Sequence, residues 1–359
     1  MFKMAALNVI KTNEIMVLTM VQIDVTAASG NNVRMSFQRR PFLIAALAVA
    51  ALFLGPGAAQ AQSDDKLEKV EILLDWKALP TYAGFYLARR MGAFERRGLE
   101  VTFAETQGAL SSAAMIGEGK PYWIGSSSGV ATAIGVSKGQ PIKSLAVYYP
   151  KTPTVIYTRG EDRIAVPRDL YGKSLGLVAG SITNEEFRAL IAANKLDRGR
   201  IKEIPVEWNA YDLVDKKVDA LIDYDEMSPS ELIAEGRRIT MIRLSDYGVR
   251  AYSLNLIIND AAWADPAKRA TALKIVEAVQ EGYNSVKERA GDAAGHFSTL
   301  FPRLAPRYVE RAIATVSQQL SGPPTGIQTR AGWEATIKTL ESLNLLAKPI
   351  TVDDVAIFN

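Results

Sequence analysis

Apolar runs typical of buried strands alternate with helical periodicity from residue 70 onward. Residues 70–76 form such a run, and within 81–97 four apolar residues recur at the spacing of one helix face. Further strands are expected at 99–104, 122–125, 142–148 and 154–158, with helices at 109–116 and 129–137. This alternation of strands and helices predicts a parallel α/β sheet.

The alternation begins again at residue 173, which predicts a second sheet. Residues 173–195 have the order strand, loop, helix, and strands are expected at 201–206, 218–224, 238–244 and 254–258. The chain then becomes helical, with Asp265 as N-cap and Pro266 at the first helical position.

Together these patterns predict an α/β protein of two lobes. We expect 66–158 plus 250–359 to form lobe one and 159–249 to form lobe two. The chain would cross between the lobes twice, so the crossings would act as a hinge. A ligand cleft is expected between the lobes, because ligands of open α/β sheets bind beyond the carboxyl ends of the strands.

The first 61 residues have the pattern of a processed targeting segment. After Met35, two Arg residues precede an apolar run at 42–54, and Ala59-Gln60-Ala61 follows as an A-x-A cleavage motif. The run is short for a membrane span, which is the alternative interpretation. We expect residues 1–34 to be an upstream extension, and the mature protein to lie outside the cytoplasmic membrane without a lipid anchor.

Composition restricts the chemistry open to this chain. It has 359 residues, is 48% hydrophobic and 23% charged, and is long enough for two domains. Its net charge is +3, but residues 1–61 carry five basic and two acidic residues, so the remainder carries 37 of each and is neutral. Neutrality gives no reason to expect nucleic acid as a partner. With no Cys and a single His, His296, thiolate catalysis, disulfides and Cys-bound metal are excluded, and His-based chemistry has little scope.

Three blocks of the sequence resemble the periplasmic solute-binding proteins of ABC importers. The first block, 73–101, contains Leu74-Asp75-Trp76, Gly92-Ala93-Phe94 and Gly98-Leu99 in the order typical of that superfamily, and the others are 119–149 and 216–236. The branch is the one that binds thiamine-pyrimidine precursors and is related to nitrate-, alkanesulfonate- and taurine-binding proteins. The resemblance implies a type II-like two-lobed periplasmic binding protein that works as a monomer with a permease and an ATPase. It implies no cofactor, metal or catalytic residue.

The resemblance also includes fungal thiamine-pyrimidine synthases, which use a Lys that carries pyridoxal phosphate, a donor His and a Cys-rich motif. Ser127 and Ala131 stand at the Lys and His positions, and the chain has no Cys. This departure implies a binding protein and not a synthase. Many pyrimidine binders have a His soon after the Trp, where Tyr82 stands here. The ligand therefore stays open between a pyrimidine precursor and an alkanesulfonate, taurine or nitrate.

Candidate ligand contacts in lobe one lie at the ends of predicted strands. Trp76 can stack on a flat ligand, with core packing as the alternative. Asp75 can accept hydrogen bonds from ligand N–H groups or hold the following loop in place. Tyr82 is a candidate from its place in the resemblance. Hydroxyl groups complete the set. Ser126, Ser127 and Ser128 lie near a helix start, where capping is the alternative role, and Tyr148 and Tyr149 lie at a strand end, where packing is the alternative.

Lobe two contributes two further groups. Ser181 and Thr183 lie at a helix start, where they could hold an oxyanion, although Thr183 and Glu186 also fit a capping box. The second group lies at the end of the strand predicted at 218–224. An acid there could accept hydrogen bonds from the N–H groups of an aminopyrimidine and would repel anions; the alternative is that these acids form a solvated turn without ligand contact. The residues there are Tyr224, Asp225 and Glu226, and the sequence does not decide which of the two acids faces the cleft.

Overall fold

The computed structural model describes residues 4–12, 15–23, 67–321 and 324–358. Contacts divide the chain into two compact units, residues 1–64 and 65–359. In the first unit, β1 (Met4–Thr12) pairs antiparallel with β2 (Ile15–Ile23). The signal segment predicted at 35–61 lies outside the described residues. In the described part of the chain, no helix is both long and apolar enough to cross a membrane.

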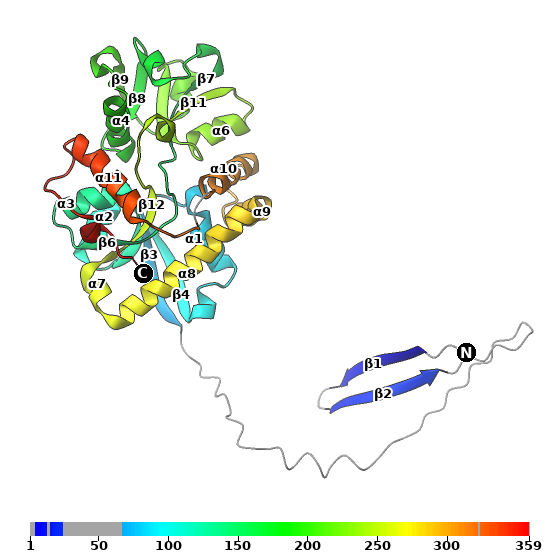
Figure 1. Cartoon of the computed structure of the whole chain (residues 1–359). Coiled ribbons are helices and arrows are strands. Elements are labelled where there is room, and N and C mark those ends of the chain that lie inside the picture. Colours follow the sequence, from blue (N-terminus) through cyan, green and yellow to red (C-terminus); the bar gives the residue numbers. More distant parts are fainter. Residues whose placement is uncertain (1–3, 13–14, 24–66, 322–323, 359) are drawn as a thin grey trace, which may run out of the picture. The chain divides into compact units, whose positions relative to one another are not determined.

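The second unit is built on two five-stranded sheets, one in each lobe (Figure 1). The first sheet has the strand order β4-β3-β5-β12-β6. Its strands are β3 (Glu68–Leu74), β4 (Leu99–Glu105), β5 (Ile124–Ser128), β6 (Ile142–Val147) and β12 (Leu254–Asn259). The second sheet has the order β11-β7-β10-β8-β9. Its strands are β7 (Thr154–Arg159), β8 (Ser174–Val178), β9 (Lys202–Val206), β10 (Ala220–Tyr224) and β11 (Ile239–Arg243).

Both sheets are mixed, so the prediction of a parallel sheet was wrong. Strands β3, β4 and β5 are parallel to one another, whereas β12 runs antiparallel to β5 and β6. In the second sheet β8, β9 and β10 are parallel and β7 runs antiparallel to β10 and β11. The two reversed strands, β7 and β12, are the first that the chain forms after each crossing between the lobes.

The first boundary between the lobes differs from the prediction. Lobe one was expected to continue to residue 158, but β7 (Thr154–Arg159) pairs within the second sheet. The chain therefore crosses before Thr154. The apolar run was recognised as a strand, but its pattern carries no information on which sheet it joins, because both of its faces are covered in either lobe.

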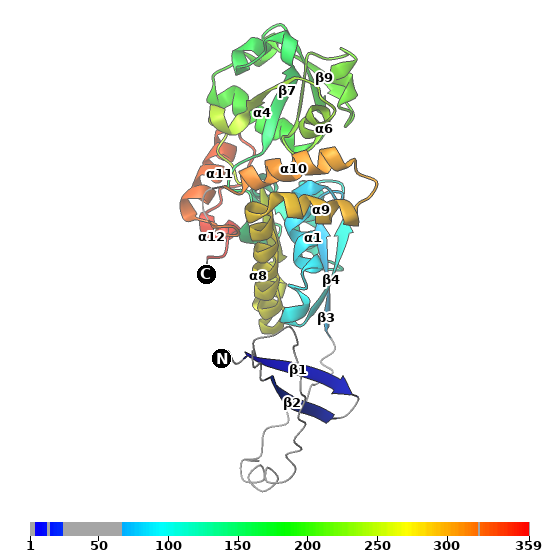
Figure 2. The same cartoon turned by 90° about the vertical axis from the view of Figure 1, so that its right-hand side faces the viewer.

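Helices cover the first sheet and continue toward the second lobe (Figures 1 and 2). Three come from the first half of the chain: α1 (Ala83–Arg90), α2 (Ala109–Glu118) and α3 (Gly129–Ser137). Six follow β12: α7 (Asp260–Ala264), α8 (Pro266–Glu288), α9 (Ala290–Leu300), α10 (Pro306–Gln319), α11 (Arg330–Ser342) and α12 (Val352–Val355). The second lobe has α4 (Ile182–Ala193), α5 (Tyr211–Val214) and α6 (Ser228–Ala234).

Short 3-10 helices connect these elements. They are η1 (Pro80–Tyr82), η2 (Glu95–Arg97), η3 (Gly160–Asp162), η4 (Pro167–Leu170), η5 (Arg198–Arg200) and η6 (Leu244–Tyr247). The helix predicted over 81–97 is thus η1, α1 and η2, with a break at Gly92, which has φ +70°. The predicted cap at Asp265 is confirmed, because its carboxylate accepts hydrogen bonds from the N–H groups of Ala267 and Lys268.

Helices α1 and α8 approach closely enough to require glycine. A Cβ on Gly282 of α8 would lie 1.9 Å from the carbonyl oxygen of Gly84 on α1. This approach brings Tyr283 into the core, where its ring stacks on Tyr148 with centroids 4.8 Å apart and meets the edge of Phe85. The glycine pair therefore positions an aromatic residue of α8 beside the end of β6.

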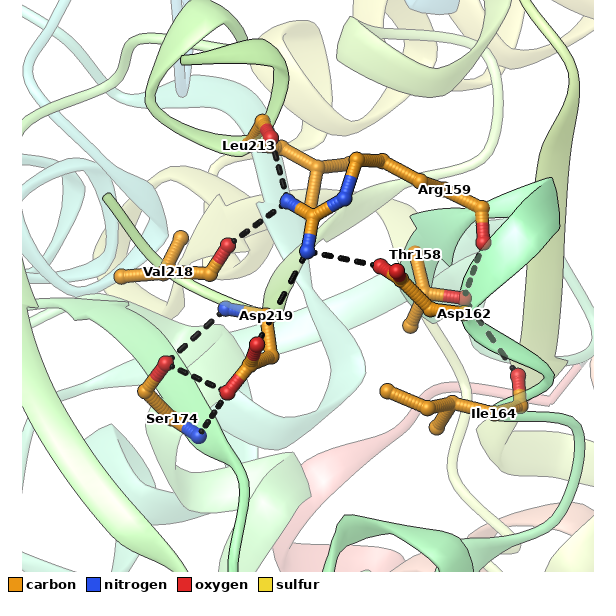
Figure 3. A network of polar contacts seen from close by, with 8 residues as sticks. All are labelled: Thr158, Arg159, Asp162, Ile164, Ser174, Leu213, Val218 and Asp219. Atoms are coloured by element: carbon orange, nitrogen blue, oxygen red, sulfur yellow. Dashed lines mark hydrogen bonds and ion pairs between the residues drawn. The ribbon is translucent and has the colours of Figure 1, made fainter. Parts of the chain in front are cut away.

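Helix α10 lies at the junction of the lobes (Figure 2), packing against α6 of the second lobe and η1 of the first. Within the second lobe, Arg159 joins the end of β7 to the loop before β10 (Figure 3). Its guanidinium donates to the carbonyl oxygens of Leu213 and Val218 and forms ion pairs with Asp162 at 2.7 Å and Asp219 at 3.7 Å. These bonds fix the start of β10, the end opposite the junction, because Ala220 pairs with Thr158 and Tyr224 pairs with Thr154.

Candidate ligand-binding site at the junction of the lobes

The end of β3 is held in place by hydrogen bonds around Asp75. The carboxylate of Asp75 accepts a hydrogen bond from the hydroxyl of Tyr82 at 3.0 Å and another from Ser126 at the end of β5. The backbone N–H of Asp75 donates to the Ser126 hydroxyl oxygen at 2.9 Å. Burial raises the pKa of Asp75, and the bonds from Ser126 and Tyr82 oppose that rise. Asp75 therefore has a structural role in addition to any contact with a ligand.

Trp76 extends from this fixed strand end toward the second lobe. Its half-buried ring meets Trp208, which follows β9, edge-on with centroids 6.1 Å apart and an interplanar angle of 64°. The ammonium group of Lys77 lies 5.9 Å from the centre of the Trp76 ring. Trp76 therefore contacts both lobes and is not wholly enclosed in the core of lobe one.

The three serines of β5 are all buried, and their hydroxyls have partners within lobe one. Ser127 donates to the carbonyl oxygen of Ala109 at 3.1 Å. Ser128 caps α3, accepting from the N–H of Ala131 at 3.1 Å. Only the hydroxyl of Ser126 reaches a residue of the junction, Asp75. The serine cluster is thus mainly a structural device for joining β5, α2 and α3.

The two acids after β10 face different partners. The carboxylate of Asp225 pairs with the guanidinium of Arg243 at 2.9 Å, within lobe two. The carboxyl of Glu226 instead accepts a hydrogen bond at 3.0 Å from the hydroxyl of Thr81, which belongs to η1 of lobe one. Glu226 is 0% exposed, and its Oε2 atom has no hydrogen-bond partner among the described residues. Of the two acids between which the sequence could not decide, Glu226 is therefore the one that faces the other lobe.

Thr81 is held on the lobe-one side by two tyrosines. The hydroxyl of Tyr283 donates to the Thr81 carbonyl oxygen at 2.8 Å, and that of Tyr149 donates to it at 3.4 Å. Tyr148 stacks on Tyr283 and is buried, with no described partner for its hydroxyl. Of the two tyrosines that follow β6, Tyr148 and Tyr149, it is therefore Tyr149 whose hydroxyl bonds to a residue of the junction.

Glu186, on α4, is a second buried acid of lobe two. Its carboxyl accepts a hydrogen bond from the hydroxyl of Thr154, at the start of β7. The capping box suggested for Thr183 and Glu186 was wrong, because α4 begins at Ile182 after Ser181, and Thr183 lies inside the helix. The hydroxyls of Ser181 and Thr183 lie 2.8 Å apart and bond to each other. The three-residue spacing of Thr183 and Glu186 fits a capping box, but in the structure Glu186 is a buried acid inside α4.

Burial dominates the electrostatics of these acids. It raises the pKa of Glu226 to about 8, with the charges of Asp225 and Asp223 adding to the rise and the hydrogen bond from Thr81 opposing it. It raises the pKa of Glu186 to about 7 and that of Asp223 to about 6, in each case against hydrogen bonds from nearby hydroxyls. In the described part of the chain, no Lys or Arg forms an ion pair with Glu226, Glu186 or Asp75.

Tyr224, the last residue of β10, is influenced by acids of both lobes. Burial raises its pKa well above the ordinary value, and the charges of Glu186 and Asp75 raise it further. Because Glu186 belongs to lobe two and Asp75 to lobe one, the Tyr224 ring lies within electrostatic range of both. The junction therefore collects carboxyl and phenol groups, an arrangement that favours ligands with N–H donors over anions.

The structure thus sorts the predicted contacts into two groups. Residues that meet at the junction are Asp75, Trp76, Tyr82, Ser126, Tyr149, Tyr224 and Glu226. Residues with partners elsewhere are Ser127, Ser128, Ser181, Thr183 and Asp225, whereas Tyr148 stacks on Tyr283 without a described partner for its hydroxyl. Residues at or beside the junction that the sequence analysis did not propose are Thr81, Glu186, Trp208 and Tyr283. Trp208 had a recognisable signal, since it follows a strand end by two residues, as Trp76 does.

A surface groove of about 430 Å³ lies elsewhere, along α8 and beside Met91 and Arg97. Charged side chains line it, including the half-buried Arg97, which pairs with Glu277 and Glu281. These ion pairs are surface pairs that satisfy each other. The groove lacks the buried, unpartnered polar group that Glu226 provides, so we place the candidate site at the junction.

A family model described as NMT1/THI5 like matches residues 79–293, which is more than half of the chain. The chain belongs to the NMT1/THI5-like family. The match begins just before Thr81 and ends after Tyr283, so it includes the hydroxyl and carboxyl groups at the centre of the junction. It leaves out Asp75 and Trp76, at the end of β3.

Relatives of this NMT1/THI5-like protein include both binding proteins and enzymes. It is 24% identical over 327 residues to the formylaminopyrimidine-binding protein of Halalkalibacterium halodurans, covering 88% of this chain and 98% of that protein. It is 31% identical over 123 residues to the 4-amino-5-hydroxymethyl-2-methylpyrimidine phosphate synthase of Uromyces fabae, covering 33% of this chain and 36% of the synthase. The similarity to the synthase is thus confined to a third of each chain.

Solved structures show that the NMT1/THI5-like chain has the periplasmic binding protein fold. The alkanesulfonate-binding protein of Xanthomonas axonopodis pv. citri, bound to MOPS, superposes with a TM-score of 0.64 at 16% identity, over 81% of this chain and 99% of that one. The aliphatic sulphonate binding protein of Escherichia coli gives 0.63 at 14% identity, over 80% and 91%. The desulfurization enzyme DSZB gives 0.57 at 13% identity, over 80% and 96%. The two-lobed fold expected from the sequence is therefore confirmed.

Proposed function

We propose that this chain is an extracytoplasmic solute-binding protein that delivers a thiamine pyrimidine precursor, such as formylaminopyrimidine, to an ABC importer. It works as a monomer with a permease and an ATPase, after removal of its signal peptide and without a lipid anchor. The relative that aligns with nearly the whole chain is named as a formylaminopyrimidine-binding protein. The ligand binds at the junction of lobe one, 67–153 plus 250–358, and lobe two, 154–249.

One observation carries the choice of ligand. Glu226 is buried between the lobes, bonded through one oxygen to Thr81 and without a described partner for the other. A buried carboxyl needs a partner, and an amino or ring N–H group of a pyrimidine supplies one. A hydrogen bond from such a group contributes roughly 0.5–1.5 kcal/mol when it meets the neutral carboxyl and roughly 1.5–3 kcal/mol when it meets the carboxylate. Glu226 is therefore proposed to receive the donor face of the ligand.

The same junction disfavours an oxyanion. A sulfonate or nitrate would lie near Glu226, Glu186 and Asp75, none of which pairs with a Lys or Arg in the described residues. Burial raises the pKa of Glu226 to about 8, so near neutral pH an anion would hold this carboxyl in its protonated form, and the anion would find no described Lys or Arg paired with these acids to offset its desolvation. The helix start proposed for holding an anion in lobe one is capped by Ser128, whose hydroxyl accepts from Ala131. Alkanesulfonate, taurine and nitrate therefore remain the alternative ligands that the experiment compares.

We propose no catalysis for this chain. The position aligned with the synthase Lys is Ser127, which is buried and donates to the carbonyl oxygen of Ala109. The position aligned with the donor His is Ala131, inside α3. The sequence has no Cys to supply the Cys-rich motif. A side chain for Schiff-base formation is thus missing at the place where the resemblance requires it.

Calorimetry on ligand-stripped protein tests the proposal. Formylaminopyrimidine is titrated first, followed by taurine, an alkanesulfonate and nitrate, and we expect binding of the pyrimidine alone. Trp76→Ala should weaken that binding roughly 2- to 12-fold, the factor that corresponds to about 0.5–1.5 kcal/mol for an aromatic stacking contact.

Trp263→Ala is the matched control for the loss of a tryptophan. Trp263 lies on α7, directly after β12. The end of β12 pairs with the start of β5, through Ile258 and Ile124, so Trp263 lies away from the carboxyl ends of β3 and β5. This variant should keep the wild-type affinity. Submicromolar binding of a sulfonate without binding of the pyrimidine would overturn the ligand assignment and leave the anion-binding alternative.

A further inference from the structure

Two tryptophans from different lobes stand in equivalent places. β3 ends at Leu74 and Trp76 follows two residues later; β9 ends at Val206 and Trp208 follows two residues later. The carboxyl ends of strands in both sheets point toward the junction, as the meeting of these rings shows. A large aromatic ring therefore extends from each lobe toward the other.

Their contact is the one aromatic pair that joins the two lobes among the described residues. The rings meet edge-to-face, with centroids 6.1 Å apart and an angle of 64°. Trp208 is 43% exposed, whereas Glu226 at the centre of the junction is 0% exposed. The tryptophan pair thus lies where the two lobes meet solvent, whereas Glu226 is enclosed.

The two halves of the pair are supported differently. Trp76 follows Asp75, whose carboxylate and N–H are bonded to Tyr82 and Ser126. Trp208 lies in a turn in which the N–H of Asn209 donates to the carbonyl oxygen of Glu207 at 2.8 Å, and all three turn residues are exposed. Trp208 keeps 43% of its surface exposed, and the aromatic ring it contacts in the described residues is that of Trp76. The contact between the rings therefore depends on the relative position of the lobes.

We propose that Trp208 is the lobe-two half of an aromatic gate, which closes on Trp76 and sets the rate at which a bound ligand leaves the junction. This inference rests on the proposed function for the identity of the ligand but not for the existence of the gate. Trp208 acts as a positioning residue: it holds the closed arrangement in which Thr81 and Glu226 bond across the lobes. An edge-to-face pair that forms only on closure slows opening and leaves the first encounter with ligand almost unchanged.

The first experiment needs no ligand. Lys77 and Glu207 are exposed neighbours of the two tryptophans, and the chain has no other cysteine, so Lys77→Cys with Glu207→Cys accepts two spin labels at defined sites. Pulsed EPR on the full chain should give a short distance population. Adding Trp208→Ala should shift the distribution to longer and broader distances, and Trp263→Ala should leave it unchanged.

The second experiment measures kinetics by stopped flow with formylaminopyrimidine. Trp208→Ala should raise the dissociation rate roughly 2- to 12-fold, the factor equivalent to about 0.5–1.5 kcal/mol for an aromatic pair, and change the association rate less than twofold. Trp208→Phe keeps an aromatic edge and should recover part of the slow dissociation. Trp76→Ala combined with Trp208→Ala should be no faster than the more affected single variant, because the gate is already open.

The outcomes separate the gate from the proposed ligand. An unchanged distance distribution in the Trp208→Ala protein overturns the gate, whatever the binding data show. A shifted distribution in a protein that binds none of the pyrimidine probe supports the gate and contradicts the ligand assignment. A shifted distribution with unchanged dissociation of bound pyrimidine also overturns the proposal, because the contact then has no influence on the exit of the ligand.

Discussion

Replacing Glu226 by Gln tests the charge state of the buried acid at the junction. Burial raises the pKa of Glu226 from its ordinary 4.5 to about 8. Between these two values the folded protein keeps the carboxyl proton and the unfolded chain loses it. The folded state then binds more protons than the unfolded state, so the free energy of unfolding falls as the pH rises.

The magnitude follows from the size of the shift. One pKa unit corresponds to 1.36 kcal/mol, so a rise from 4.5 to about 8 gives a total near 4 to 5 kcal/mol as an upper value. The stabilisation is fully present below pH 4.5, declines toward pH 8 and changes little above it. Gln cannot ionise, and its side-chain oxygen can still accept the hydrogen bond from Thr81. The Glu226→Gln protein should therefore lose this part of the pH dependence.

Urea unfolding of the ligand-free protein between pH 5 and 8.5 measures the effect. The free energy of unfolding of Glu226→Gln minus that of the wild type should increase with pH by up to about 1.4 kcal/mol per unit. Buried Glu186 titrates with the same sign, but its pKa is raised only to about 7, so the larger part of the change from pH 7 to 8 comes from Glu226. Glu186→Gln should accordingly flatten the curve below pH 7 and leave the slope above it.

Glu277→Gln is the control for removing an acid from the exposed surface, since the Glu277 side chain is 64% exposed. It should keep the wild-type pH dependence. The reasoning is refuted if the curves of Glu226→Gln and the wild type run parallel from pH 6 to 8. Parallel curves would mean that Glu226 is ionised in the folded protein and has a partner or a solvent path that the junction does not reveal.

Three further predictions follow from other parts of the chain. Gly282→Ala should destabilise the protein by about 3 kcal/mol or more in urea unfolding, because its Cβ would meet the carbonyl oxygen of Gly84, whereas Gly291→Ala, which meets nothing within 4 Å, should have little effect. N-terminal sequencing of exported protein should begin at Gln62 or within a few residues of it, and exported protein that keeps Met35 would contradict the signal prediction. X-ray scattering should show a smaller radius of gyration on saturation with formylaminopyrimidine, and an unchanged radius would argue against hinge closure.

Local patterns predicted the elements of this fold well. Helix α3 covers 129–137 as expected, and α8 starts at the predicted Asp265-Pro266 cap. These elements have signals within a few residues: a serine or aspartate cap, a glycine after the last turn, or a proline at the first helical position. The two lobes were predictable for the same reason, because the alternation of strands and helices visibly restarts after residue 158.

The relations between elements were not predictable from such patterns. A buried strand has the same composition whether it runs parallel or antiparallel, so the reversal of β7 and β12 left no trace in the sequence. The membership of β7 in the second sheet was missed for the same reason. The sequence also could not show which acid faces the other lobe, because Asp225 and Glu226 are adjacent. Their roles differ only through their partners, Arg243 for Asp225 and Thr81 for Glu226.

Fold alone does not decide the ligand of this chain, because sulfonate-binding proteins and a desulfurization enzyme share its architecture. What differs between such proteins must lie in the groups at the junction. An oxyanion site needs donors that are free to turn toward the ligand, and here the hydroxyls of Ser127 and Ser128 are engaged inside lobe one. A site for N–H donors needs buried acceptors, and Glu226 provides one that is already shared between the lobes through Thr81. Since the same carboxyl meets both lobes, a ligand that donates to it strengthens the closed arrangement, which couples recognition of the ligand to closure of the protein.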